Sequence, residues 1–75
     1  MTYELRIHIF HEQASSRWPT RHAAECELRA FAAAAQLDVH IHPAEYIGHA
    51  ISSAYRRGGD PLFDAVAIVR QVRES

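Results

Sequence analysis

The chain has 75 residues, of which 48% are hydrophobic and 23% charged, and its formal net charge at pH 7 is −1. This apolar content excludes a disordered chain, and the length predicts one compact domain over residues 1–75. Near-neutral charge excludes strong attraction of the whole molecule to nucleic acid or to an anionic membrane.

The cellular setting follows from cysteine usage and from the lack of export signals. Cys26 is the single cysteine, so it has no partner for an internal disulfide. The opening residues lack the pattern of a signal peptide, and no apolar run has the length of a membrane span. We therefore expect a cytoplasmic protein with no membrane partner.

The first predicted element is a strand over Thr2–Phe10. Apolar and polar residues alternate there, which is typical of a strand with one buried face. The β-branched and aromatic residues of this segment also favour a strand. Residues His11–Ser16 are polar without a period, and we interpret them as a connection.

A helix is predicted over Thr20–Gln36, where the apolar side chains fall at three- and four-residue intervals on one stripe. These are Ala24, Leu28, Phe31 and Ala35.

A second strand follows over Leu37–His42 and ends at Pro43. Leu37, Val39 and Ile41 alternate with polar residues, so this strand also has one buried face. Every other element is expected to pack beside it or over it.

A second helix is predicted over Pro43–Arg57. Proline suits a first helical turn, and Arg56 and Arg57 suit the last turn of a helix that Gly58 ends.

The final segment, residues 61–73, allows two interpretations. Asp60 and Pro61 form a good helix start, whereas Ala65–Val69 is a β-rich apolar run. We favour a strand over Phe63–Val72. The predicted fold is therefore α/β, a small two-layer βαβαβ sandwich with both helices on one face of a three-stranded sheet in the order 1-2-3. If the last segment is a helix, a second copy must complete the sheet.

The uncovered face of this sheet is expected to be polar. It would carry Arg6, His8, His40 and His42, with Arg70 or Gln71 from the third strand. Imidazoles two apart on a strand can converge on a metal ion. No Cys or carboxylate is spaced to complete a tetrahedral set, so we favour a solvated face and predict no metal and no cofactor.

Cys26 lies four residues after His22 on the first predicted helix, so the two side chains can touch and the imidazole can activate the thiol. Cysteine is more often a buried small hydrophobe, and we expect Cys26 to face inward. Because no motif marks a nucleophile, we predict that the protein is not an enzyme.

The function predicted instead is a non-enzymatic protein-binding module. Trp18 lies in a connection between Arg17 and Pro19, where we expect it to be exposed, and Trp and Arg anchor many interfaces. The size class suggests an inhibitor or adaptor of the type made by phages and mobile elements, such as an anti-CRISPR protein or an antitoxin. The predicted partner-binding residues are Arg6, His8, Arg17, Trp18, His40, His42, Arg56 and Arg57.

Two alternatives remain open. The first is a nucleic-acid-binding domain that uses the Arg- and His-bearing sheet face, although nine acidic residues argue against it. The second is a metal-binding protein with a histidine cluster. We also expect a homodimer, formed through the edge of the first or third strand or through Phe10, Val66 and Ile68 on the open face.

Overall fold

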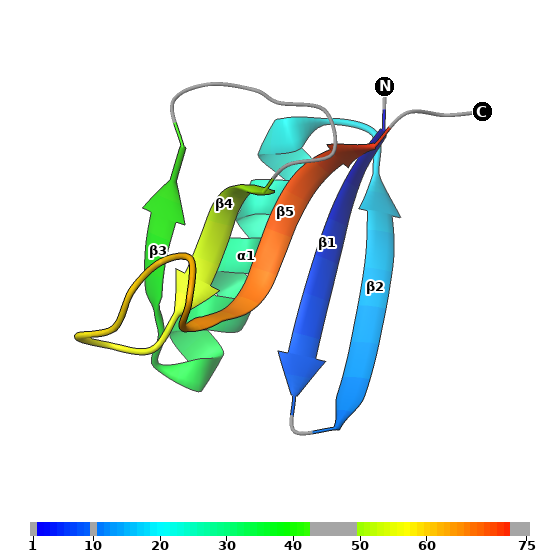
Figure 1. Ribbon diagram of the computed structural model, residues 1–75. Helices are drawn as coiled ribbons and strands as arrows, with labels where there is room; N and C mark the ends of the chain where they lie inside the picture. Colours follow the sequence, from blue (N-terminus) through cyan, green and yellow to red (C-terminus); the bar gives the residue numbers. More distant parts are fainter. Residues whose placement is uncertain (1, 10, 43–49, 73–75) are drawn as a thin grey trace.

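The computed structural model describes residues 2–9, 11–42 and 50–72, which form a five-stranded antiparallel sheet with one helix packed on one face (Figure 1). The predicted two-layer α/β arrangement is confirmed in that form, whereas two helices on three strands is wrong. In chain order the elements are β1 (Thr2–Ile9), β2 (Glu12–Trp18), α1 (Arg21–Ala35), β3 (Asp38–Ile41), β4 (Ala50–Tyr55) and β5 (Ala65–Val72).

The strand order in the sheet is β2-β1-β5-β4-β3. The last strand in the chain therefore lies at the centre, and neither β1 nor β5 is an edge. The predicted sequential order of strands is wrong, because β5 pairs with β1 and β4, and all four strand pairs are antiparallel. The helix α1 connects the two edge strands, and it lies behind the sheet in Figure 1.

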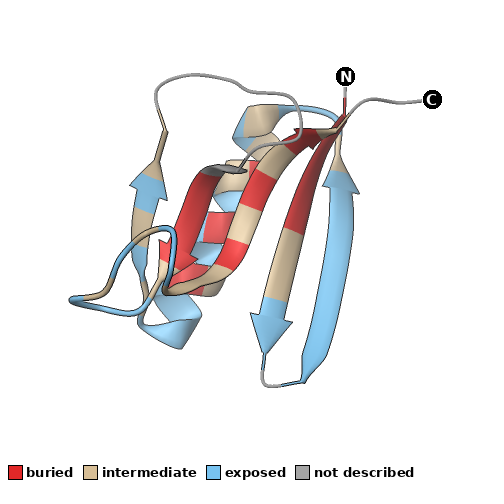
Figure 2. Ribbon diagram, viewed as in Figure 1, coloured by how far each residue is buried: buried red, intermediate tan, exposed pale blue. Residues whose placement is uncertain are grey.

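The segment interpreted as a polar connection, His11–Ser16, belongs mostly to β2. This strand pairs with β1 over its whole length, from Glu12 opposite Ile9 to Trp18 opposite Tyr3. Figure 2 shows that β2 is exposed along nearly all of it. An edge strand with little cover needs no apolar face, so it has no alternation that a sequence pattern could reveal.

The helix predicted over 43–57 is also wrong where the structure describes it. Residues 50–55 form β4, which pairs with β3 on one side and β5 on the other. Ser52 and Ser53 are buried there. Serine is a weak helix former, and here the hydroxyl of Ser52 donates to Glu25 on α1 and that of Ser53 donates to the carbonyl of Pro61. The predicted helix start at residues 43–49 lies outside the described residues.

The predicted strand over 63–72 is confirmed as β5, and the predicted strand over 37–42 is confirmed in the shorter β3. The latter is a four-residue edge strand and does not organise the sheet. Because one chain supplies five strands, the sheet needs no second copy to complete it.

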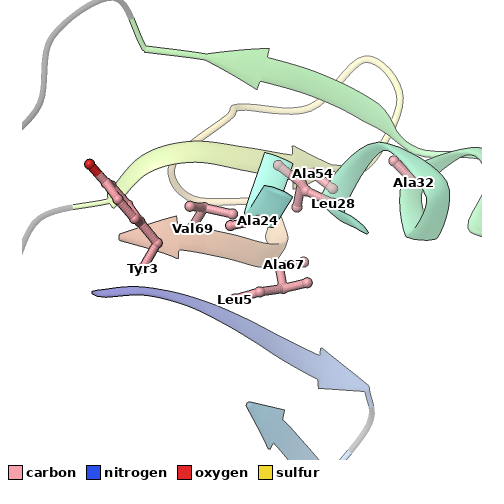
Figure 3. Packing of buried hydrophobic residues seen from close by; sticks show 8 residues of the cluster. All are labelled: Tyr3, Leu5, Ala24, Leu28, Ala32, Ala54, Ala67 and Val69. Atoms are coloured by element: carbon pink, nitrogen blue, oxygen red, sulfur yellow. The ribbon is translucent and has the colours of Figure 1, made fainter. Parts of the chain in front are cut away.

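The predicted helix is confirmed as α1. Thr20 caps it, since its Oγ1 accepts a hydrogen bond from the amide of Ala23 at 3.1 Å. The helix ends at Gln36, which takes the left-handed conformation with φ 59°. Figure 3 shows how side chains from α1 and the sheet pack together. The buried core comprises Tyr3, Leu5, Ala24, Leu28, Ala32, Ala54, Ala67 and Val69.

A partly buried polar network fixes the N-terminal half of α1 over the sheet. The Nε of Arg21 donates to Oε2 of Glu25 at 3.1 Å, and the same carboxylate oxygen accepts from the hydroxyl of Ser52 on β4. Arg21 also donates to the carbonyl oxygen of His42, just after β3. These contacts orient α1 across the β3 side of the sheet.

Candidate functional site

The connection between β4 and β5 holds two large apolar side chains in solvent. Leu62 is 71% exposed and Phe63 is 86% exposed. Both lie in the turn formed by residues 60–64, within the β4–β5 connection that extends sideways from these strands in Figure 1. Two adjacent apolar residues in this position are unusual, because most exposed apolar residues on a monomer are scattered singly.

Hydrogen bonds from two aspartates define the shape of the 60–64 turn. Oδ1 of Asp60 accepts from the amides of Leu62 and Phe63, at 2.8 and 3.0 Å. Oδ2 of Asp64 accepts from the amide of Asp60 at 2.7 Å, and the amide of Asp64 donates to the carbonyl of Asp60 at 2.9 Å. The backbone that carries the two apolar side chains is therefore held in one conformation.

The same turn is fastened to the sheet at its base. The hydroxyl of Ser53 on β4 donates to the carbonyl of Pro61 at 2.8 Å. The amide of Gly59 donates to the carbonyl of Arg56 at 2.9 Å. A Cβ on Gly59 would lie 2.7 Å from Oδ2 of Asp64, so a larger residue would displace the carboxylate that shapes the turn.

The hydrogen bonds at Asp60 also affect its titration. The amides of Phe63 and then Leu62 hold the pKa of the Asp60 carboxyl below its ordinary value of 3.8. The hydrogen bonds of the turn therefore stabilise the charged carboxylate form of Asp60. It is the state present at neutral pH.

An open cleft of about 560 Å³ lies next to the 60–64 turn. It forms beyond the last paired residues of β1 and β5, Ile7 and Ala67, from which the two strands continue with different neighbours. Its apolar lining includes Ile9, Phe31, Leu37, Phe63 and Val66, and its polar lining consists of His8, Arg56 and Asp64. We call this feature the apolar cleft.

The sequence predicts Phe63 inside a strand and gives no separate role to Leu62. A local signal for the turn is present, because Asp60 followed by Pro61 is a capping pair. An Asp side chain that accepts from amides two and three residues later also fits an isolated turn. The apolar residues within such a turn then have no helix face to occupy.

On the sheet face opposite α1, the cross-strand register forms a charged row. Glu4 on β1 lies opposite Arg17 on β2 and opposite Arg70 on β5. Oε1 of Glu4 lies 3.1 Å from Nη2 of Arg6 and 3.1 Å from Nε of Arg70. Glu4 is 7% exposed, so the guanidinium groups cover the carboxylate that positions them.

The predicted histidine cluster is not brought together. His8 lies on β1 and His40 on β3, and β5 and β4 separate these strands. His40 and His42 do lie near each other, with ring centroids 6.3 Å apart. Within residues 2–9, 11–42 and 50–72, no group of three potential metal ligands is found.

The remaining predicted partner-binding residues are spread over the molecule. Trp18 is half-buried against the core, and its Nε1 donates to Oγ of Ser16 at 2.9 Å, so the prediction of an exposed indole is wrong. Its register with Tyr3 explains this, because cross-strand partners share a face and Tyr3 faces α1. Arg56 lines the apolar cleft, and Arg57 is exposed beside it in sequence.

Cys26 and His22 touch as their spacing predicts, with Sγ and Nε2 3.5 Å apart. The expectation that Cys26 faces inward is wrong, since both residues are exposed on α1. The core stripe of the helix runs through Ala24, Leu28 and Ala32 instead.

Comparisons with known proteins found no matching family model, no matching curated protein and no matching solved structure. In the part of the chain that the structure describes, no helix combines the length and hydropathy required to cross a membrane.

Proposed function

We propose that the protein is a non-enzymatic protein-binding module and that residues 60–64, together with the apolar cleft, form its partner-binding surface. The observation that carries this proposal is the exposure of Leu62 and Phe63 on a backbone fixed by hydrogen bonds. A partner that binds here does not have to order the turn, which removes a large entropic penalty of association.

The chemistry of the partner follows from the surface. Phe63 and Leu62 would bind an apolar pocket on the partner that accepts an aromatic ring and a branched side chain. The apolar cleft calls for an apolar side chain of the partner. Arg56 and Asp64 at the cleft and Asp60 in the turn call for partner charges of both signs at the rim.

The surface supports binding better than it supports catalysis. Among the described residues that line the apolar cleft, there is no Ser, Thr or Cys that could act as a nucleophile. The one cysteine lies on α1 as an exposed side chain and is not among the residues that line the apolar cleft. An inhibitor or adaptor role, as in an anti-CRISPR protein or an antitoxin, stays a prediction of the size class.

Affinity capture with matched variants tests the proposal. The wild-type protein, the Leu62→Ser/Phe63→Ser variant and a control Gln13→Ala variant on exposed β2 are each used to capture proteins from a lysate of the native cells. The captured protein is then purified and its Kd measured against all three. We expect the double variant to bind at least about 30-fold more weakly, as for the loss of a 2 kcal/mol hot spot, and the control to bind as the wild type does.

Thermal unfolding shows whether the double variant is folded. Because both replaced side chains are exposed, its midpoint should equal that of the wild type. A captured protein that binds the folded double variant as tightly as the wild type would overturn the assignment of the surface. Failure to capture any protein specifically would overturn the function.

A further inference from the structure

We propose that the half of the open sheet face formed by β2, β1 and β5 binds the phosphate groups of a single-stranded nucleic acid. This site is separate from the partner-binding surface and goes beyond the proposed function. It rests on the charged row of Glu4, Arg17 and Arg70, with Arg6 two residues along β1.

The charge on this half-face differs from that of the whole chain. Three arginines and one glutamate lie there, and two of the arginines contact the glutamate, whereas the protein as a whole carries a net charge of −1. The acidic residues that make the net charge of the whole chain negative lie mostly elsewhere. Examples are Glu25 and Glu27 on α1 and Asp60 and Asp64 in the turn. The global balance therefore hides a locally positive surface.

Glu4 acts as a positioning residue for two of these guanidinium groups. Its buried Oε1 holds Nη2 of Arg6 and Nε of Arg70, each at 3.1 Å. Each guanidinium carries five N–H donors, so most remain available to other acceptors. Nε of Arg6 is buried and finds no acceptor in the part of the chain that the structure describes. The N–H groups of Arg6 and Arg70 that do not contact Glu4 lie beside exposed Arg17, and phosphate oxygens accept hydrogen bonds from such groups.

The spread of the arginines favours a strand of phosphates over a single ion. Arg17 and Arg70 are two strand positions apart, which is roughly 10 Å at the usual spacing of strands. Because Arg6 and Arg70 are held on Glu4, exposed Arg17 on the edge strand can contact a phosphate other than the one that they contact. Next to this half, the same sheet face carries Tyr55 on β4, whose ring can stack on an unpaired base.

The test measures binding of a fluorescent homopolymeric single strand of about 20 nucleotides by anisotropy over a series of salt concentrations. Three phosphate contacts predict a slope of log K against log salt of about −2, at about −0.7 for each contact. Between about 50 and about 200 mM salt, affinity should therefore fall about 15-fold.

Two matched variants locate the site. Arg17→Gln removes an exposed charge from the row and should reduce the slope by about 0.7. Arg29→Gln removes the same charge from the exposed surface of α1 and should leave the slope unchanged. The triple variant Glu4→Gln/Arg6→Gln/Arg70→Gln removes the rest of the charged row without leaving a buried charge unpaired. Relative to the wild type, the triple variant should lose most of the salt dependence of binding, because only Arg17 of the three arginines is left. A thermal melt checks that it folds.

Several outcomes would overturn the proposal. One is a slope near zero, and another is equal sensitivity to Arg17→Gln and Arg29→Gln. Binding to inorganic phosphate and binding to vesicles that contain anionic lipid are measured in parallel. Binding to either of these without binding to the oligonucleotide would also exclude a nucleic acid as the ligand.

Discussion

Glu4 and Arg70 face each other across the β1–β5 pair, and Nε of the arginine lies 3.1 Å from Oε1 of the glutamate. A second guanidinium, from Arg6, approaches the same oxygen. The carboxylate is nearly buried on a face that α1 does not cover, so the arginine side chains provide much of its cover.

This relationship predicts a loss of stability when the carboxylate charge is removed. We expect Glu4→Gln to reduce the free energy of unfolding by about 1–2 kcal/mol, because two partly exposed guanidinium groups lose a charged acceptor. The control is Glu27→Gln, an exposed position on α1, which should change stability by less than about 0.5 kcal/mol. Urea unfolding measures both, and equal effects would show that the buried carboxylate has no special role.

A pair of identical substitutions tests where the core lies. Leu28→Ala removes a side chain that is fully buried between α1 and the sheet, and we expect it to destabilise the domain by about 2–4 kcal/mol. Leu62→Ala makes the same change in the exposed 60–64 turn and should alter stability by less than about 0.5 kcal/mol. The urea midpoints of the two variants give the comparison, and similar midpoints would contradict the described packing.

The turn should respond to pH through Asp60. The pKa of this carboxyl is lowered in the folded protein by the amides of Phe63 and Leu62, so its contribution to stability is present above the ordinary value of 3.8. That contribution is lost as the pH falls through the lower folded pKa. In Asp60→Asn, the free energy of unfolding should therefore fall less between neutral and acidic pH than it does in the wild type.

Nuclear magnetic resonance can follow the titration directly. The amide shifts of Leu62 and Phe63 should titrate together, with a midpoint below 3.8 in the wild type, and should lose this transition in Asp60→Asn. A midpoint at or above 3.8 would mean that the two hydrogen bonds do not stabilise the carboxylate.

The elements that the sequence predicts well are those with one face against the core. In α1, Ala24 and Leu28 recur at helical spacing because they pack on the sheet, and in β1, Tyr3 and Leu5 alternate for the same reason. The central β5 was also recognisable, since Ala67 and neighbouring residues form a short apolar run. Burial creates these patterns, so they reveal the elements that contribute most to the core.

The elements that the sequence does not predict are those in which burial leaves no pattern of apolar residues. The edge strand β2 is exposed and polar, and pairing with β1 defines it. In β4, Ser52 and Ser53 are buried, but the hydroxyl of Ser52 interacts with Glu25 on α1 and that of Ser53 with the Pro61 carbonyl in the turn after β4. Such partners become visible only when the fold is known.

The candidate sites divide in the same way. For the open face the sequence predicts Arg6 and either Arg70 or Gln71. The register puts Gln71 beside Tyr3 on the face that α1 covers and places Arg6 and Arg70 on the open face. The grouping of Arg17 with them was not predictable, because it depends on the unrecognised strand β2. The apolar cleft likewise depends on how β1 and β5 separate beyond Ile7, which no local pattern encodes.

The last prediction concerns self-association through the partner-binding surface. Phe63 lines the apolar cleft of its own chain, so a projecting apolar group and a hollow lie side by side. A two-fold axis near this point would let Phe63 of each copy enter the cleft of the other, and each contact would then occur twice. The cleft, at about 560 Å³, is within the range of pockets that accept groups larger than an aromatic ring.

Sedimentation equilibrium in reducing buffer tests this, because Cys26 is exposed and could otherwise form disulfide-linked dimers. We expect a mass that rises with concentration from 8.5 kDa toward twice that value. Phe63→Ser should keep the mass at 8.5 kDa, whereas Ser15→Lys, which places a charge on the β2 edge, should leave association unchanged. Association that is lost in Ser15→Lys and retained in Phe63→Ser would instead assign the contact to pairing of β2 edges. A wild-type mass of 8.5 kDa at every concentration would exclude the dimer, and the surface would then remain free for a different protein.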